Sequence, residues 1–336
     1  MKNAVKIAIL DSGINVNHDY LKNSIKTGYS FVKSDENYRI IEGNYCDDFG
    51  HGTICASAIK KECKDIKFYI YKVLDKEGKG NLNILETALK SLIGSDIDII
   101  NMSLAVMNET VIEDLDNICK RLESENKILV CSPSNRSERS YPACLESVIG
   151  VKAKLMKKKD EFWFNRNKEV QAVVDSIPYL HCDLNNKYQI NGHSNSFSAA
   201  KFTGVIARIL SENNGMKKDD LINTLEKISV KHNWTEADLD EDFNIFRVQY
   251  EGDKSIREFV EKKLMEFLNI HDKSILYNYD LYSLEVGFYD EKCYEFLRIL
   301  EDYFYFNIED YTNVSFYDLN SINGLVSLIE RNINDK

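Results

Sequence analysis

Over its first two thirds, the chain alternates short apolar runs with longer amphipathic stretches. The apolar runs predict buried strands at Val5–Leu10, Ile66–Val73, Ile97–Met102, Lys127–Cys131 and Ser147–Lys152. The stretches between them have apolar residues near helical spacing and predict helices at Gly52–Lys60, Leu82–Ile93, Thr110–Glu125, Ala199–Ser211 and Lys218–Lys227. Such alternation favours an α/β fold with a parallel sheet flanked by helices. In open sheets of this kind, the reacting groups gather at the carboxyl ends of the strands.

The last quarter of the chain has a different character. Residues 231–252 lose the clear period, become polar and acidic, and predict a linker. Beyond it, amphipathic patterns predict three helices at Ile256–Leu268, Lys292–Phe304 and Ser321–Ile333. Residues 253–336 carry 17 acidic and 9 basic residues, a net charge of −8. We therefore predict two domains, with residues 1–230 forming the sheet and residues 253–336 a small acidic helical bundle.

Charge and composition exclude several classes of partner. The formal charge of −11 argues against nucleic acid, which proteins bind by neutralising phosphates with Lys and Arg. No signal-like segment precedes Val5, and no apolar stretch reaches the roughly 18 residues that span a bilayer. We therefore expect a cytoplasmic protein without a membrane segment. The eight cysteines show no CxxC or zinc spacing, so we expect reduced thiols, most of them buried.

Three short segments place a polar, reactive residue among small ones. Asp11 directly follows the first predicted strand, in the run ILDSG. His51 lies between two glycines in DFGHGT, at the start of a predicted helix. Ser196 lies in NGHSNSFSAAKFTG, where a helix begins and its dipole favours a developing oxyanion. Each has an ordinary interpretation when taken singly: Asp11 as a turn former, His51 as a structural or exposed histidine, and Ser196 as a helix cap.

Together the three segments resemble the subtilisin-like serine peptidases, the subtilases. That family carries Asp, His and Ser in this order, in signatures similar to Asp-Ser/Thr-Gly, His-Gly-Thr and Ser-Met/Phe-Ala-x-Pro-His-x-x-Gly. Residues 71–80 (YKVLDKEGKG) and 98–104 (DIINMSL) resemble further segments of the family. The resemblance runs from about residue 4 to 229 and implies a subtilisin-like sheet. It also implies that Asp11 orients His51, that His51 is the general base and that Ser196 is the nucleophile.

The same resemblance assigns an oxyanion donor and a substrate cleft. Asn135, in the run SPSN, stands at the position of the asparagine that binds the oxyanion in the family. The predicted cleft residues are Ser103, Leu104, Ala105, Val106, Ser132 and Ser134. Many relatives have glycine at the positions of Ala105, Val106 and Ser134. The added side chains should narrow the pocket for the residue before the cleaved bond, so we expect small or slender side chains there.

The nucleophile segment departs from the family pattern, and its register has to be chosen. Ser194, Ser196 and Ser198 crowd the segment. Choosing Ser196 places Phe197 after the nucleophile and Gly204 eight residues on, as the family pattern requires. Ala200 and Lys201 replace the usual Pro-His pair, and Ser194 replaces a glycine that lets the substrate backbone approach.

Residues 253–336 resemble an acyl or peptidyl carrier protein in length, acidity and helix order. The likeness lies in residues 280–287, 295–310 and 315–329. In this alignment the serine that carries phosphopantetheine falls at Asp290, which has no hydroxyl to modify. The resemblance therefore implies a docking domain for a protein partner, with a structural cap as the alternative.

The sequence thus predicts a serine endopeptidase that processes an intracellular peptide or protein through an acyl-enzyme. An inactive subtilisin-like scaffold that binds a peptide or a synthetase partner remains the alternative. A nucleotide-binding α/β protein is excluded, because the first strand leads into DSG and no glycine-rich phosphate loop follows. We expect no cofactor and no catalytic metal. Structural calcium is compatible with the family, but no acidic loop is specific enough to assign ligands.

Overall fold

A computed structural model of the chain describes residues 4–34, 37–106, 112–135, 139–156, 158, 160–239, 250, 252–289 and 291–334. These residues form two compact units. The first contains the described residues up to Ser176, Asp183–Asn186, and the described residues from Gly192 to Leu239. The second, the helical unit, contains Ile177–Cys182, Lys187–Asn191 and the described residues from Tyr250 onward. The path of the chain between Ser176 and Gly192 therefore alternates between the units.

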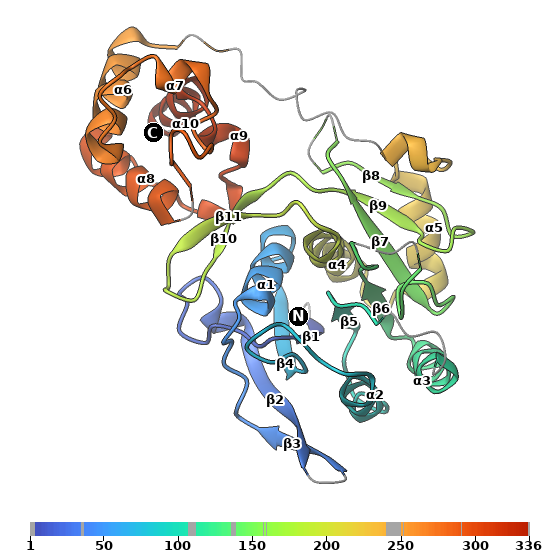
Figure 1. The fold of residues 1–336 in the computed structure, drawn as a ribbon. Coiled ribbons are helices and arrows are strands. Elements are labelled where there is room, and N and C mark those ends of the chain that lie inside the picture. Colours follow the sequence, from blue (N-terminus) through green and yellow to red (C-terminus); the bar gives the residue numbers. More distant parts are fainter. Residues whose placement is uncertain are drawn as a thin grey trace. The chain divides into compact units, whose positions relative to one another are not determined.

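The first unit is built on a nine-stranded sheet with the order β3-β2-β4-β1-β5-β6-β7-β9-β8 (Figure 1). The strands are β1 (Val5–Asp11), β2 (Ile25–Ser34), β3 (Asn37–Glu42), β4 (Ile66–Lys72), β5 (Ile99–Met102), β6 (Ile128–Cys131), β7 (Val148–Lys154), β8 (Phe162–Phe164) and β9 (Ala172–Asp175). Neighbouring strands are parallel except for the β2–β3 and β8–β9 pairs. β1 lies inside the sheet, between β4 and β5, which places its carboxyl end at the centre of one edge.

Helices cover both faces of this sheet. They are α1 (His51–Glu62), α2 (Leu82–Ser91), α3 (Ile112–Ser124), α4 (Asn195–Glu212) and α5 (Lys218–Ile228). α2 and α3 pack their leucines against Ala8, Leu10 and Ile100 in one apolar core. Because side chains alternate along a strand, the fully buried Ile7 and Ile9 point to the opposite face. α1 and α4 lie side by side there (Figure 1).

The helical unit has its own apolar core. It contains α6 (Lys254–Leu268), α7 (Ile275–Asn278), α8 (Glu291–Phe304), α9 (Phe316–Leu319) and α10 (Ile322–Asn334). An antiparallel pair, β10 (Tyr179–Cys182) and β11 (Tyr188–Asn191), completes it. The three predicted helices correspond to α6, α8 and α10. Asp253 is the N-cap of α6, because its carboxylate accepts hydrogen bonds from the backbone N–H groups of Ser255 and Ile256.

The structure confirms the predicted α/β fold with a mainly parallel sheet, but it differs from the sequence-based prediction in several elements. The five predicted strands are β1, β4, β5, β6 and β7, whereas β2, β3 and β8–β11 were not predicted. α4 starts at Asn195 rather than Ala199, because Ser194 caps it. α3 starts at Ile112, and residues 110 and 111 of the predicted helix lie outside the described residues.

Part of the predicted linker is folded. Trp234 is buried against Met156 and Val173 of the first unit. Lys231 pairs with Asp238, which lies in the short 3-10 helix Glu236–Leu239. Residues 231–239 therefore pack onto the sheet unit, and the rest of the predicted linker, apart from Tyr250 and Gly252, lies outside the described residues.

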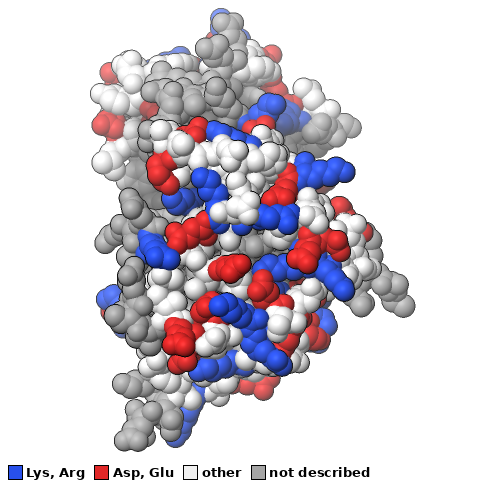
Figure 2. All heavy atoms as spheres, turned by 90° about the vertical axis from the view of Figure 1, so that its right-hand side faces the viewer, with Lys and Arg blue, Asp and Glu red and all other residues white. Residues whose placement is uncertain are grey.

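The surface view in Figure 2 shows acidic and basic side chains interleaved on one face of the molecule. Ion pairs such as Arg166–Glu226 and Lys152–Glu236 have the same mixed character. The face in view therefore carries no large field of one sign. Within the described part of the chain, no helix has both the length and the apolar character needed to cross a membrane.

Candidate active site

The predicted catalytic residues come together at the carboxyl edge of the sheet. Asp11 is the last residue of β1, and Ser103 follows β5. His51 is the first residue of α1, and Ser196 is the second residue of α4. Because α1 and α4 pack side by side, the His51 and Phe197 rings lie only 5.5 Å apart, measured between their centres. The topology therefore brings three segments that are remote in sequence to one place.

Asp11 and His51 form the best defined contact of the site. His51 Nδ1 lies 2.8 Å from Asp11 Oδ1 and 3.0 Å from Oδ2. The carboxylate is fully buried and also accepts a hydrogen bond from the backbone N–H of Ser12 at 2.8 Å. An ionised carboxylate can only accept, so Nδ1 carries a proton and Nε2 of the neutral ring is left as the base.

The charge of Asp11 also sets the proton affinity of His51. Burial by itself would lower the pKa of His51, but the adjacent carboxylate raises it well above the ordinary value of 6.5. The imidazolium formed after proton transfer would therefore be stabilised where it stands. This is the electrostatic environment that a general base needs when its positive charge develops during a reaction.

A network that was not predicted from the sequence fixes the start of α1. The Asp47 carboxylate accepts hydrogen bonds from the backbone N–H groups of Phe49, Gly50 and Thr53 and from the Thr53 hydroxyl, at 2.7–3.0 Å. Although burial opposes it, these donors together lower the pKa of Asp47. Gly50 has φ +99°, in the left-handed region that favours glycine. The turn before His51 is therefore fixed by one buried carboxylate and one glycine.

Close backbone packing explains the glycine after His51. A Cβ at Gly52 would lie 2.2 Å from the Gly13 carbonyl oxygen, so no larger residue fits without movement. The Gly52 N–H donates to the Ser12 hydroxyl at 3.0 Å, which ties α1 to the end of β1. The signatures DSG and HGT are thus two sides of one contact.

The surroundings of Ser196 favour it over its two neighbouring serines. Ser194 is the N-cap of α4, and its hydroxyl accepts the Phe197 N–H at 3.4 Å. Ser198 is buried, at 1% exposure. Ser196 is half-buried, and its hydroxyl donates to the Ser103 carbonyl at 3.3 Å, while the Ser103 hydroxyl donates to the Ser196 carbonyl at 2.9 Å. The Ser196 hydroxyl thus bonds Ser103 here. Catalytic hydrogen bonds, such as one from Ser196 to His51, are often long or misaligned until a substrate binds.

Asn135 lies beside the start of α4, as an oxyanion donor would need to. Its Oδ1 accepts the backbone N–H of Asn195 at 3.3 Å, so its amide N–H groups are the part of the side chain that would donate to a ligand. Asn195 was not singled out from the sequence. Its side chain accepts the Ala153 N–H at 2.8 Å and donates to the Pro133 carbonyl at 3.3 Å. Asn195 therefore links the nucleophile helix to β7 and to the loop of Asn135.

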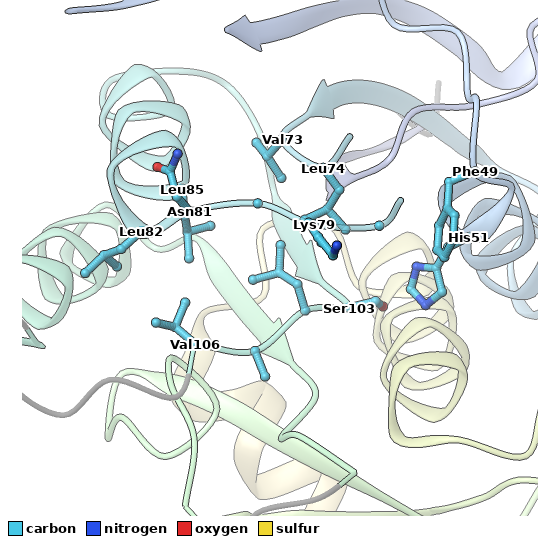
Figure 3. Close-up of a pocket in the computed structure, with 14 residues that line it drawn as sticks. Phe49, His51, Val73, Leu74, Lys79, Asn81, Leu82, Leu85, Ser103 and Val106 are labelled. Atoms are coloured by element: carbon cyan, nitrogen blue, oxygen red, sulfur yellow. The ribbon is translucent and has the colours of Figure 1, made fainter. Parts of the chain in front are cut away.

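A cavity of about 470 Å³ opens beside His51 (Figure 3). Four of the predicted cleft residues line it: Ser103, Leu104, Ala105 and Val106. Phe49, Leu74 and Lys79 line it as well; they lie in the segments DFGHGT and YKVLDKEGKG but were not predicted as cleft residues. The other two predicted residues are absent from this lining in the described part of the chain: Ser132 is buried at 1% exposure, and Ser134 is half-buried.

Cys55 is a further polar neighbour of the catalytic histidine. Its Sγ lies 3.8 Å from His51 Nδ1, and ligand atoms of Asp11, His51 and Cys55 lie within 4.8 Å of one another. Burial raises the pKa of Cys55, which favours the protonated thiol. A metal ion bound by these three groups would displace the proton between Asp11 and His51. The hydrogen-bonded pair therefore fits the observed geometry better than a metal centre.

An α/β sheet that presents a buried Asp–His pair beside the first turn of a serine-bearing helix defines a serine-hydrolase type of site. Residues 2–243 match the model of the subtilase family, peptidase family S8. The match covers more than half of the chain, and the chain belongs to this family.

Curated relatives include the major intracellular serine protease of Bacillus subtilis (strain 168), 28% identical over 225 residues, which cover 62% of this chain and 68% of the relative. The minor extracellular protease Epr of the same organism is 26% identical over 263 residues, 74% of this chain but only 38% of Epr. The intracellular serine protease of Paenibacillus polymyxa is 28% identical over 200 residues, 55% of this chain and 60% of the relative. The matches thus span 38% to 68% of these relatives' lengths.

Solved structures show the same fold. Sphericase superposes with a TM-score of 0.57 at 19% identity, over 67% of this chain and 83% of that structure. The S41 psychrophilic protease gives a TM-score of 0.56 at 18% identity, with the same coverage. At these identities the likeness concerns the fold alone, and it confirms the subtilisin-like sheet.

Proposed function

We propose that this chain is a serine-type endopeptidase that hydrolyses peptide bonds through an acyl-enzyme. One observation carries the proposal: the buried Asp11 carboxylate holds His51 Nδ1 at 2.8 Å at the edge of the sheet where α4 presents Ser196. Family membership and relatives described as serine proteases support it.

The mechanism follows from the positions of these groups. The Ser196 hydroxyl attacks the scissile carbonyl carbon and passes its proton to His51 Nε2, while Asp11 stabilises the imidazolium. The Asn135 amide and the Ser196 N–H donate to the oxyanion. His51 then returns the proton to the leaving amine, and water hydrolyses the ester in the reverse sense. Loss of an oxyanion donor typically lowers turnover by about 10²–10³.

Endopeptidase activity is tested by incubating the full chain with a mixture of unstructured peptides blocked at both termini. Mass spectrometry of the products then identifies the cleaved bonds. Because both termini are blocked, any cleavage must be internal. The Ser196→Ala variant should leave the peptides intact over the same period. If the wild-type chain binds the peptides without cutting them, the inactive scaffold becomes the better account.

We further propose a cytoplasmic role in processing a peptide or protein substrate. The names of two relatives describe intracellular proteases, which supports this setting. The side chains of Ala105 and Val106, which line the cavity, support a preference for a small or slender residue before the cleaved bond. Peptides that differ only at that residue test the preference: small residues should give the highest kcat/KM, and a maximum for bulky aromatic residues would refute it.

For the C-terminal part, we propose that residues 253–336 dock a protein partner as a carrier-like module without a phosphopantetheine arm. Its net acidity and its order of helices support the idea, while Asp290 itself lies outside the described residues. The test is incubation with a phosphopantetheinyl transferase and coenzyme A, followed by intact mass measurement. We expect no mass gain on this part, and a gain would overturn the proposal.

A further inference from the structure

The segment that leads into the nucleophile helix is built into the helical unit. β10 and β11 form a hairpin that ends at Asn191, five residues before Ser196. Both strands group with the helical unit, whereas Ser176 before them and Gly192 after them group with the first unit. The segment of the nucleophile, residues 192–198, can therefore adopt only conformations that are compatible with a hairpin packed in the helical unit.

The hold on the hairpin is apolar and well packed. Leu180 is fully buried and Ile190 is 9% exposed, both in the core of the helical unit. The Tyr188 ring lies 5.5 Å from that of Tyr294 and 5.0 Å from that of Tyr311, centre to centre. Aromatic contacts at these distances stabilise beyond the area they bury.

Backbone hydrogen bonds join the first strand of the hairpin to residues 314–316 of the helical unit. The Leu180 N–H donates to the Val314 carbonyl at 2.9 Å, and the Phe316 N–H donates to the Pro178 carbonyl at 2.8 Å. The hairpin is therefore an integral part of the helical unit and not a loop resting on it.

The root of the hairpin, meaning residues 175–176 and 192–193 on either side of it, is bonded to α4, the helix that carries Ser196. Asp175 ends β9, is fully buried, and lies with Oδ2 3.0 Å from Nζ of Lys201 on α4. Burial disfavours the ammonium form, but Asp175 and other carboxylates raise the pKa of Lys201, which favours the protonated amine beside Asp175. Ser176 Oγ lies 3.1 Å from His193 Nδ1, which joins the two chain segments of the root. Displacement of the root thus acts on α4 directly.

The tip of the hairpin, residues 183–187, is connected through Asn15 to α1, the helix that carries His51. Asn15 Nδ2 donates to the Asp183 carbonyl and to Asn186 Oδ1, each at 3.0 Å. The Asn15 N–H in turn donates to the Thr53 hydroxyl on α1, two residues after His51. Root and tip therefore each end on a helix that carries a catalytic residue.

We propose that the helical unit, acting through this hairpin, positions Ser196 for catalysis, and that Tyr188, Leu180 and Ile190 are the positioning residues. The inference rests on the proposed peptidase function, because it concerns the nucleophile of that reaction. Misplacement of a reacting group by about 1 Å can cost about 10²-fold in rate. Loosening the hairpin should therefore slow chemistry at Ser196 without touching the site.

The experiment uses the full chain with Tyr188→Ala, Tyr188→Phe and a control, Phe259→Ala. Phe259 is another aromatic residue of the helical unit, and it packs on Tyr303 and Phe304 of α8. The rate at which a fluorophosphonate labels Ser196 is measured well below each melting temperature. We expect Tyr188→Ala to label about tenfold or more slowly, with Tyr188→Phe and Phe259→Ala within about twofold of wild type. Tyr188→Ala at the wild-type rate, or an equal loss in Phe259→Ala, would overturn the proposal.

Two additions keep the test decisive. If Tyr188→Ala does not fold, Ile190→Val removes one methylene from the hairpin, and Ile256→Val on α6 is its matched control; only the former should slow labelling.

Hydrogen exchange of residues 192–198 gives a readout that needs no activity. Faster exchange there in the hairpin variant than in its control supports the proposal, and equal exchange contradicts it. A wild-type chain that is not labelled at all would refute the peptidase function instead, leaving the coupling to be judged by exchange.

Discussion

Buried carboxylates serve different ends in the two units. In the first unit, Asp11 is paired with His51, whose side chain is 20% exposed and lines a cavity. In the helical unit, Glu301 is similarly buried, but its carboxylate accepts from the Ile308 N–H, Arg298 and the Tyr311 hydroxyl. Both satisfy the rule that a buried charge needs partners. Asp11 is paired with an imidazole, which can lose its proton and lines a cavity, whereas the exposed partner of Glu301 is the guanidinium of Arg298, which stays protonated. This difference separates a site that can transfer a proton from an ion pair that only stabilises the fold.

Removal of the nucleophile of the first unit should have the largest effect on peptide turnover. Ser196→Ala should lower peptide turnover by about 10⁶, leaving only the rate that binding and the oxyanion donors supply. Ser194→Ala is the matched control, since Ser194 caps α4. It should retain activity while lowering the free energy of unfolding by about 0.5–2 kcal/mol. Steady-state kinetics and denaturant unfolding of both variants check this; loss of turnover in Ser194→Ala alone would show that the assigned register is wrong.

The Asp11–His51 pair predicts the pH dependence. Because Asp11 raises the pKa of His51, kcat/KM should fall as the pH drops through a value above 6.5, where the base becomes protonated. Asp11→Asn removes the charge, so the acidic limb should move to lower pH and kcat should fall by about 10⁴. Profiles of kcat/KM against pH for the two proteins measure both effects. An unmoved acidic limb would mean that another group controls it.

The same pair has a consequence for stability. A raised pKa in the folded state means that protonated His51 stabilises the fold at low pH, and that this contribution is lost as pH rises through the folded-state pKa. Asp47 acts in the opposite sense: its lowered pKa stabilises the fold above the unfolded value, and the contribution is lost as pH falls through the lowered one.

A matched pair of buried carboxylates gives the smallest but most specific contrast. Asp47→Asn leaves one oxygen where four donors converged, and Glu301→Gln weakens a comparable network in the helical unit. Each should lower the free energy of unfolding by about 1–3 kcal/mol. Only Asp47→Asn should also lower kcat, because its carboxylate holds the turn before His51. Unfolding and kinetics measured together decide this, and equal effects on kcat would break the distinction.

The sequence was most informative where a backbone constraint and a reactive group coincide. Gly52 marks the close approach of α1 to Gly13, so the short motifs around Asp11 and His51 were enough to predict that these two side chains meet. The role of Asp47 was not visible, because its four donors converge only once the turn has formed. Its neighbour Asp48 is exposed and pairs with Lys72 instead.

Tertiary context explains the elements that the sequence did not predict. β10 and β11 are four residues each, and many of the apolar partners of Leu180 and Ile190 lie in the helical unit, from residue 260 onward. No local pattern could reveal that pairing. Ser132, which was predicted for the cleft, directly follows β6, and its N–H donates to the Met102 carbonyl at the end of β5.

The most direct test of the central claim is covalent labelling of the full chain with a fluorophosphonate, mapped by mass spectrometry after digestion. We expect one equivalent of label on Ser196, with labelling abolished in Ser196→Ala and strongly slowed in His51→Ala. Label on Ser194, or an intact wild-type chain that takes up no label, would contradict it.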